Sequence, residues 1–246
     1  MDKLLFAQAC ENVINRERQQ EGIGTLGEKT LHAVLKEYYE PYAENHEVKV
    51  GSFVADIVGE NGIIEIQTAN FGKLIKKLDV FLEYCDVTVV HPIAARKHLI
   101  WLDGKTGELV DKRKSPKHLT IYDAADELYV IRYALDNPRF HLRLCLLEVE
   151  ETRFVGKNTK NRREGSLRVD RVPIALLDEV EFDCPDDYEK FIPAGLPEEF
   201  TCKDFAKLAK THTGNARRII NILIYLEKVC FVRKGKNREY IYRIKE

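Results

Sequence analysis

The sequence lacks the usual signatures of membrane, secreted and zinc-ribbon proteins. It has no apolar run approaching the roughly 20 residues of a membrane-spanning helix, and its first residues, Met1–Phe6, show no signal-peptide pattern. Its six cysteines are scattered, and none forms a C-x-x-C pair, so neither a zinc ribbon nor a disulfide framework is indicated. We therefore expect a cytoplasmic protein with reduced, mostly buried thiols and no membrane partner.

The charge of the chain is unevenly distributed. The 246 residues are 44% hydrophobic and 32% charged, a globular composition that predicts one or two domains. From Thr201 to the end there are 12 lysine and arginine residues and 4 acidic residues, a net charge of +8. The rest of the chain has 27 lysine and arginine residues and 36 acidic residues, a net charge of −9. We interpret this change as a domain boundary, with a small C-terminal part suited to a polyanion.

Hydrophobic periodicity predicts an α/β core, a mixed sheet flanked by helices. The expected helices are residues 2–18, a segment from about Thr25 to before Pro41, a segment beginning near Phe71, and 122–135. The expected strands are 47–50, 53–58, 63–67, 86–92 and 98–102. We expect the strand at 86–92 to run parallel to the strand at 63–67, because a helix connects them.

The strands at 53–58 and 63–67 carry the candidate functional residues. Gly59-Glu60-Asn61-Gly62 between them is typical of a hairpin turn. If the turn is Glu60-Asn61, Asp56 lies opposite Glu65; if it is Asn61-Gly62, Asp56 lies opposite Gln67.

In either register these three side chains share one face. Like charges across a strand pair repel, and a divalent cation with oxygen ligands would neutralise them. The alternative interpretation is the solvated face of an ordinary hairpin.

These residues resemble the PD-(D/E)xK nuclease superfamily, which includes type II restriction enzymes and Holliday-junction resolvases. The resemblance covers roughly residues 20–105: Glu28 in an opening helix, Asp56 in one hairpin strand and Glu65-Ile66-Gln67 in the next. It implies a restriction-endonuclease-like fold. It also implies that Asp56, Glu65 and the Ile66 carbonyl bind Mg²⁺ (or Mn²⁺), with Glu28 reaching the metal or its waters. For Glu28 the alternative is compensation of the helix dipole.

Two positions depart from the motif of that superfamily. Ala55 stands where the motif has proline, and Gln67 stands where it has lysine. Glutamine can hydrogen-bond an attacking water but cannot supply a positive charge. Lys73 or Lys76 on the next helix can supply it from another place in the chain, the alternative being a solvated helix face. The predicted catalytic residues are therefore Asp56, Glu65, Gln67, Glu28, Lys73 and Lys76.

Two segments separate this core from the C-terminal part. Residues 139–182 are interpreted as a β extension of the first domain, 1–182, with a polar, basic loop at 156–171 that either touches a phosphate backbone or is a solvated insertion. Residues 183–200 are acidic, contain three prolines and are interpreted as an interdomain linker.

Residues 201–246 resemble a winged helix-turn-helix domain: two helices and then a hairpin with a Lys-Gly-Lys-Asn tip. In such a module the second helix enters the major groove and the wing follows the backbone. The residues predicted for groove contact are Asn215, Arg217 and Arg218, and those predicted for the wing are Arg233, Lys234, Lys236 and Arg238. A protein-docking module is the alternative.

Together these features predict a metal-dependent endonuclease that hydrolyses phosphodiester bonds of DNA. Two rivals stay open: a DNA-binding regulatory protein with an inactive nuclease-like domain, favoured by the absent lysine, and a protein-interaction adaptor. The sequence leaves undecided whether the substrate is DNA or RNA, and duplex, branched or single-stranded. It equally leaves a homodimer open.

Overall fold

The computed structural model describes residues 1–20, 29–155, 166–236 and 238–245. The predicted metal-site residue Glu28 and most of the predicted basic loop lie outside the described residues. None of the described helices is both long and apolar enough to cross a membrane.

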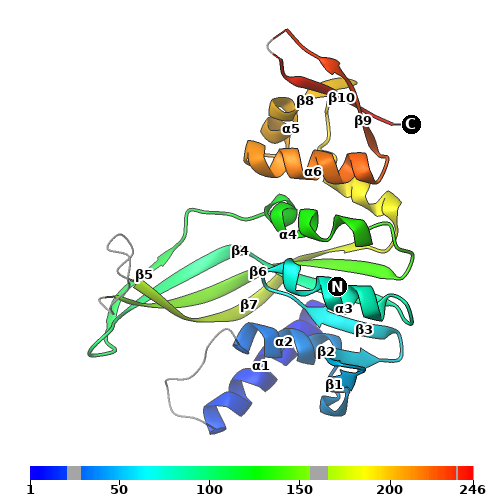
Figure 1. Cartoon of the computed structure of the whole chain (residues 1–246). Helices are drawn as coiled ribbons and strands as arrows, with labels where there is room; N and C mark the ends of the chain where they lie inside the picture. Colours follow the sequence, from blue (N-terminus) through cyan, green and yellow to red (C-terminus); the bar gives the residue numbers. More distant parts are fainter. Residues whose placement is uncertain (21–28, 156–165, 237, 246) are drawn as a thin grey trace.

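A mixed sheet forms the centre of the molecule (Figure 1). Along the sheet the order is β1 (His46–Val50), β2 (Phe53–Gly59), β3 (Gly62–Ile66), β4 (Val87–Asp103), β6 (Phe140–Val155) and β7 (Ser166–Phe182). A seventh strand, β5 (Leu109–Lys114), pairs with the distal half of β4. The predicted antiparallel order of the first three strands and the parallel pairing of β3 with β4 are confirmed, as is the α/β class.

Helices cover both faces of the sheet. On one face, α1 (Lys3–Gln20) and α2 (Lys29–Tyr39) bury a stripe of apolar side chains, including Phe6 and Leu35, against Ile57. On the other face lie α3 (Ile75–Phe81) and α4 (Ala125–Val130), both shorter than predicted because 3-10 turns flank them. Both helical layers are amphipathic, and the stripe at helical spacing explains why they form on the sheet.

The strand β4 is continuous, whereas the sequence predicts two strands, 86–92 and 98–102, the first of which ends at Pro92. The carbonyl of Val90 accepts a hydrogen bond from the backbone N–H of Gln67 at the end of β3. Because backbone groups two residues apart point to the same neighbouring strand, the backbone nitrogen of Pro92 also points to the β3 side. At that point β3 has ended, and no strand partner needs the N–H that proline lacks. Together with β5, β6 and β7, the distal half of β4 extends well beyond the helices (Figure 1). The segment 139–182 is therefore part of the main sheet.

A buried ion-pair network joins the projecting ends of β6 and β7. Glu151 is fully buried and accepts hydrogen bonds from Arg153 Nε at 2.7 Å and Arg171 Nη2 at 2.9 Å. Burial opposes ionisation of Glu151, but the two guanidinium groups outweigh it and lower the pKa of this carboxyl.

We expect Glu151→Gln to lower the free energy of unfolding at neutral pH by about 2 kcal/mol, because two arginines lose a buried counter-charge. A folded-state pKa below that of the unfolded chain contributes stability above the ordinary glutamate pKa, and this contribution is lost as the pH falls through the lowered pKa. Urea unfolding of both proteins, from neutral pH into the acid range, should show the difference shrinking. A difference that does not depend on pH would contradict this assignment.

The C-terminal part is a small helix–sheet unit. It contains β8 (Glu199–Thr201), α5 (Cys202–Leu208), α6 (Thr213–Tyr225), β9 (Val229–Lys234) and β10 (Tyr240–Ile244), with sheet order β8-β10-β9. Thr201 caps α5 as predicted, because its side chain accepts a hydrogen bond from the backbone N–H of Asp204. The Asp204 carboxylate in turn accepts a hydrogen bond from the backbone N–H of Thr201.

The acidic segment 183–200, which we interpret from the sequence as a linker, is folded against the core. Its 3-10 helix at Pro185–Phe191 buries Tyr188 and Phe191, and the Phe191 ring stacks on Phe182 at 5.1 Å. One hydrophobic cluster runs from the sheet through these aromatic residues into α5 and α6. The two parts of the chain therefore share a core.

Candidate functional site

The register of the β2–β3 hairpin places two carboxylates next to each other. Gly59 pairs with Gly62 and Ile57 with Ile64, so the turn is Glu60-Asn61. This is the first of the two predicted registers, and its continuation brings Asp56 level with Glu65. Gly62 has φ +106°, and a Cβ there would lie 2.3 Å from the Asp86 carbonyl oxygen. Only glycine permits this approach, which brings β3 against the start of β4.

Past Ile57 the two strands separate, and the Asp56 side chain fills the gap. Its Oδ2 accepts a hydrogen bond from the Ile66 backbone N–H at 2.8 Å. The same oxygen lies 3.2 Å from Nε2 of His32 on α2, which donates to the carboxylate. Among the described residues no partner contacts Asp56 Oδ1, and the side chain is partly open to solvent.

Glu65 is the buried member of the pair. Its residue is 1% exposed, and Nζ of Lys77 on α3 donates to both carboxylate oxygens, at 2.9 and 2.8 Å. Asp56 and Lys77 thus approach Glu65 from different elements, and α2, β2, β3 and α3 together build the site. We refer to His32, Asp56, Glu65 and Lys77 as the hairpin cluster.

The two carboxyl groups of the hairpin cluster differ in their pKa. Burial raises the pKa of Glu65 to about 7, against the hydrogen bonds from Lys77, and the charge of Asp56 adds to the rise. For Asp56, burial opposes ionisation, but His32 and the Ile66 amide outweigh it and lower the pKa. Glu65, which needs a nearby cation to ionise at neutral pH, therefore lies beside Asp56, which stays ionised.

The donor set suits Mg²⁺ better than a transition metal. Among the described residues, no three His, Cys, Asp or Glu side chains are arranged to hold a metal ion. Mg²⁺ needs only one or two carboxylates because it keeps several of its waters. Three oxygen ligands are available to such an ion: the carboxylate of Glu65, Oδ1 of Asp56 and the backbone carbonyl of Ile66.

Three other predicted catalytic side chains lie apart from the carboxylates. The amide nitrogen of Gln67 donates to the Ala69 carbonyl and points into the loop after β3. Lys73 and Lys76 are exposed, and in the part of the chain that the structure describes Glu65 pairs with Lys77 instead.

Sequence reasoning missed His32 and Lys77, although both leave a signal. Each lies four positions after a predicted site residue, Glu28 and Lys73, and residues four apart share a helix face. Helix spacing from the predicted residues therefore makes both of them candidates.

The neighbouring helix α4 supports the hairpin cluster and the C-terminal part together. The Glu127 carboxylate accepts from the backbone N–H groups of Asn70 and Phe71, at 2.9 and 2.7 Å, where the chain turns towards α3. The adjacent Asp126 pairs with Arg218 of α6 at 2.5 Å. Figure 1 shows α4 between the sheet and α6.

Comparison with known proteins assigns a family. The family model described as Domain of unknown function (DUF8091) matches residues 29–183, more than half of the chain. The chain belongs to this family. An uncharacterized protein of Treponema pallidum (strain Nichols) is 30% identical over 193 residues, which cover 78% of this chain and 75% of that relative. No solved structure matches the chain.

The DUF8091 match contains all four residues of the hairpin cluster and α4. It ends where β7 ends, so the C-terminal part lies outside it. The family description names no activity, and the chemistry has to be argued from the side chains.

The predicted groove-contacting residues of α6 are mostly engaged within the chain. Asn215 donates to Thr211 at 3.4 Å and Arg218 pairs with α4, whereas Arg217 is exposed and hydrogen-bonds Cys202. Since α6 packs against α4, its surface is covered on that side. In the wing, Arg233 pairs with Glu199 at 2.7 Å. Lys234, Lys236 and Arg238 are exposed and, among the described residues, have no ion pair.

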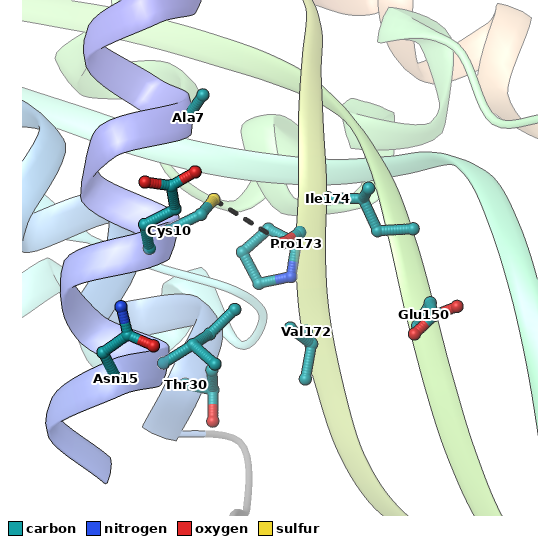
Figure 2. Close-up of a pocket in the computed structure, with 10 residues that line it drawn as sticks. Ala7, Cys10, Asn15, Thr30, Glu150, Val172, Pro173 and Ile174 are labelled. Carbon is teal, nitrogen blue, oxygen red and sulfur yellow. Dashed lines mark hydrogen bonds between the residues drawn. The ribbon is translucent and has the colours of Figure 1, made fainter. Parts of the chain in front are cut away.

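A separate pocket of about 590 Å³ lies between α1 and β7 (Figure 2). Its lining includes Cys10, whose Sγ donates to the Pro173 carbonyl at 3.6 Å. Burial raises the pKa of Cys10 to about 11, so the thiol stays protonated at neutral pH. The pocket opens on the α1 side of the sheet and holds no reactive nucleophile among the residues that line it.

Proposed function

We propose that this protein is a metal-dependent nuclease that hydrolyses phosphodiester bonds, with the hairpin cluster as its active site. The observation that carries the proposal is that the Asp56 carboxylate accepts from the N–H of Ile66, next to the buried Glu65, while Lys77 donates to both Glu65 oxygens. The resemblance to the PD-(D/E)xK superfamily gives the same two carboxylates. Burying two like charges side by side is costly unless a cation joins them.

Each residue of the hairpin cluster has a distinct proposed role. Asp56 and Glu65, with the Ile66 carbonyl, would hold Mg²⁺ or Mn²⁺, which when bound supplies charge neutralisation at the phosphate and acidifies a water. His32 fixes the orientation of the Asp56 carboxylate. Lys77 supplies the cationic side chain that Gln67 cannot, placed beside Glu65 to stabilise charge that develops on the phosphate oxygens.

One observation favours the alternative, a nucleic-acid-binding regulatory protein with an inactive nuclease-like domain. Gln67 occupies the position of the motif lysine, and its amide is turned away from the carboxylates. The two functions are separated by incubating the purified chain with mixed DNA and RNA, with Mg²⁺, with Mn²⁺ and with EDTA. Cleavage that needs the metal supports the nuclease, and binding without cleavage supports the regulator.

The C-terminal part is proposed to be a winged-helix module that brings the site to nucleic acid. Its two helices, its hairpin and the third strand β8 follow the winged-helix order, and its net +8 charge suits a polyanion. Because α6 is covered by α4, we assign the phosphate contacts to the wing.

We expect the double variant Lys236→Gln/Arg238→Gln to bind nucleic acid more weakly and with a flatter salt dependence. Each lost phosphate contact lowers the log–log salt slope by roughly 0.9 on duplex and roughly 0.7 on single strands, so two contacts give about 1.8 and about 1.4. The slope is measured by fluorescence anisotropy over a series of salt concentrations.

The matched control for this charge change is Lys3→Gln/Lys49→Gln, which removes two exposed lysines from the N-terminal part. An equal slope in the wing variant and wild type would mean that the wing does not touch phosphates. Point variants are preferred to deleting residues 201–246, because the shared core would be exposed by the deletion.

A further inference from the structure

The sheet of the wing displays aromatic side chains on its surface. Phe231 on β9 and Tyr240 on β10 are 49% and 50% exposed. Their ring centroids lie 5.3 Å apart in an edge-to-face arrangement, and the largely buried Tyr242 lies 6.4 Å from both. Paired aromatic rings left half open to water mark a contact surface rather than a core.

The same face carries a positive charge that has no ion pair among the described residues. Tyr240 is paired in register with Lys234, whose Nζ lies 5.6 Å from the Tyr240 ring centroid. The opposite face is neutralised internally, because Arg233 and Arg243 both pair with Glu199 on β8. The exposed charge and the exposed rings are therefore on one side of the sheet.

The chemistry of this face selects its partner. Aromatic rings stack on the faces of nucleobases, and a nearby lysine neutralises the phosphate that links them. In a duplex the base faces are already stacked on one another, so paired rings of this kind gain little from duplex DNA. Single-stranded nucleic acid offers both the base faces and the phosphates.

We propose that Phe231, Tyr240 and Lys234 form a stacking surface that binds single-stranded nucleic acid. The inference rests on the proposed function only in taking nucleic acid as the partner. It deepens that function by naming the form of nucleic acid that the C-terminal part holds. It also fits the packing of α6 against α4, because the wing is not covered by that contact.

The test uses the full-length chain in EDTA, where binding is measured without cleavage. Wild type, Phe231→Ala and Tyr240→Ala are titrated into a fluorescent single-stranded oligonucleotide and into the blunt duplex of the same sequence. We expect each alanine variant to bind the single strand about tenfold more weakly, since stacking is worth that order per base. Duplex affinity and the salt slope should stay at the wild-type values, because no charge is removed.

Two further sets of variants keep the result interpretable. Phe231→Tyr and Tyr240→Phe keep the rings and should bind like wild type, while Tyr84→Ala removes a 78% exposed aromatic residue elsewhere and should change nothing. Lys234→Gln should weaken single-strand binding and flatten its salt slope.

Wild-type single-strand affinity in both alanine variants overturns the proposal, and so does an equal loss on single strand and duplex. An absence of single-strand binding by the wild type overturns it too. If the protein binds single strands through these rings but cleaves nothing, the nuclease proposal fails and the stacking surface stands. Cleavage without ring-dependent binding would do the reverse.

Discussion

Replacing Asp56 with asparagine or Glu65 with glutamine is expected to remove nearly all metal-dependent cleavage of nucleic acid. Each change removes a negative charge from the hairpin cluster while keeping the shape of the side chain. In Asp56→Asn the amide side chain retains an oxygen that can accept from the Ile66 N–H, so the hairpin should stay intact. We expect the cleavage rate to fall by a factor of about a thousand, as for loss of a preorganised electrostatic group.

Glu60→Gln is the matched control, because Glu60 lies in the turn of the same hairpin and is exposed. It should cut at the wild-type rate. Fold is checked by circular dichroism and thermal unfolding. Cleavage that survives in both the Asp56 and the Glu65 variant would place the active site elsewhere in the chain.

The second large effect is expected at Lys77. Lys77→Ala leaves Glu65 buried without its ammonium partner and takes the only described lysine from beside the carboxylates. We expect the cleavage rate to fall by about a hundredfold or more, with a much smaller change in nucleic-acid affinity, because the lost charge acts on the developing phosphate charge. Single-turnover cleavage and anisotropy in EDTA measure the two quantities separately.

Lys73→Ala and Lys76→Ala are the comparison variants on the same segment. If either of them lowers the rate and Lys77→Ala does not, the lysines predicted from the sequence carry the charge. Adding Gln67→Lys to Lys77→Ala should restore part of the rate, since it returns a cation to the motif position. Wild-type cleavage in all three alanine variants would leave the metal alone responsible for charge stabilisation.

The parts of the fold that were predictable depend on local chemistry. The turn sequence at Gly59–Gly62 and the alternation of the flanking residues define the hairpin, and helix periodicity after Phe71 requires β4 to return parallel to β3. The placement of Asp56 and Glu65 on neighbouring strands follows from the hairpin, whereas the choice between Glu65 and Gln67 as the residue opposite Asp56 required the observed register. The two carboxylates themselves could be found without any structure.

The remaining features depend on contacts between distant segments. Glu127 on α4 holds the start of the helical segment that carries Lys77, so the sequence alone did not decide which lysine of that segment contacts Glu65. In the segment 183–200 the acidic residues and prolines suggested a linker, although Tyr188 and Phe191 are buried in the core. The covering of α6 by α4 is likewise a tertiary contact with no local signal.

The position of α4 has a thermodynamic consequence for the whole molecule. Asp126 holds α6 and Glu127 holds the segment leading into α3, and these two residues are neighbours in a helix of less than two turns. A shift of α4 would therefore displace both α6 and the segment that leads into α3. Linkage then requires reciprocity: if nucleic acid on the wing changes the affinity of the carboxylates for a divalent cation, the cation changes the affinity of the wing by the same factor. Two titrations, each run with and without the other ligand, would close that cycle and give the coupling free energy between the two sites.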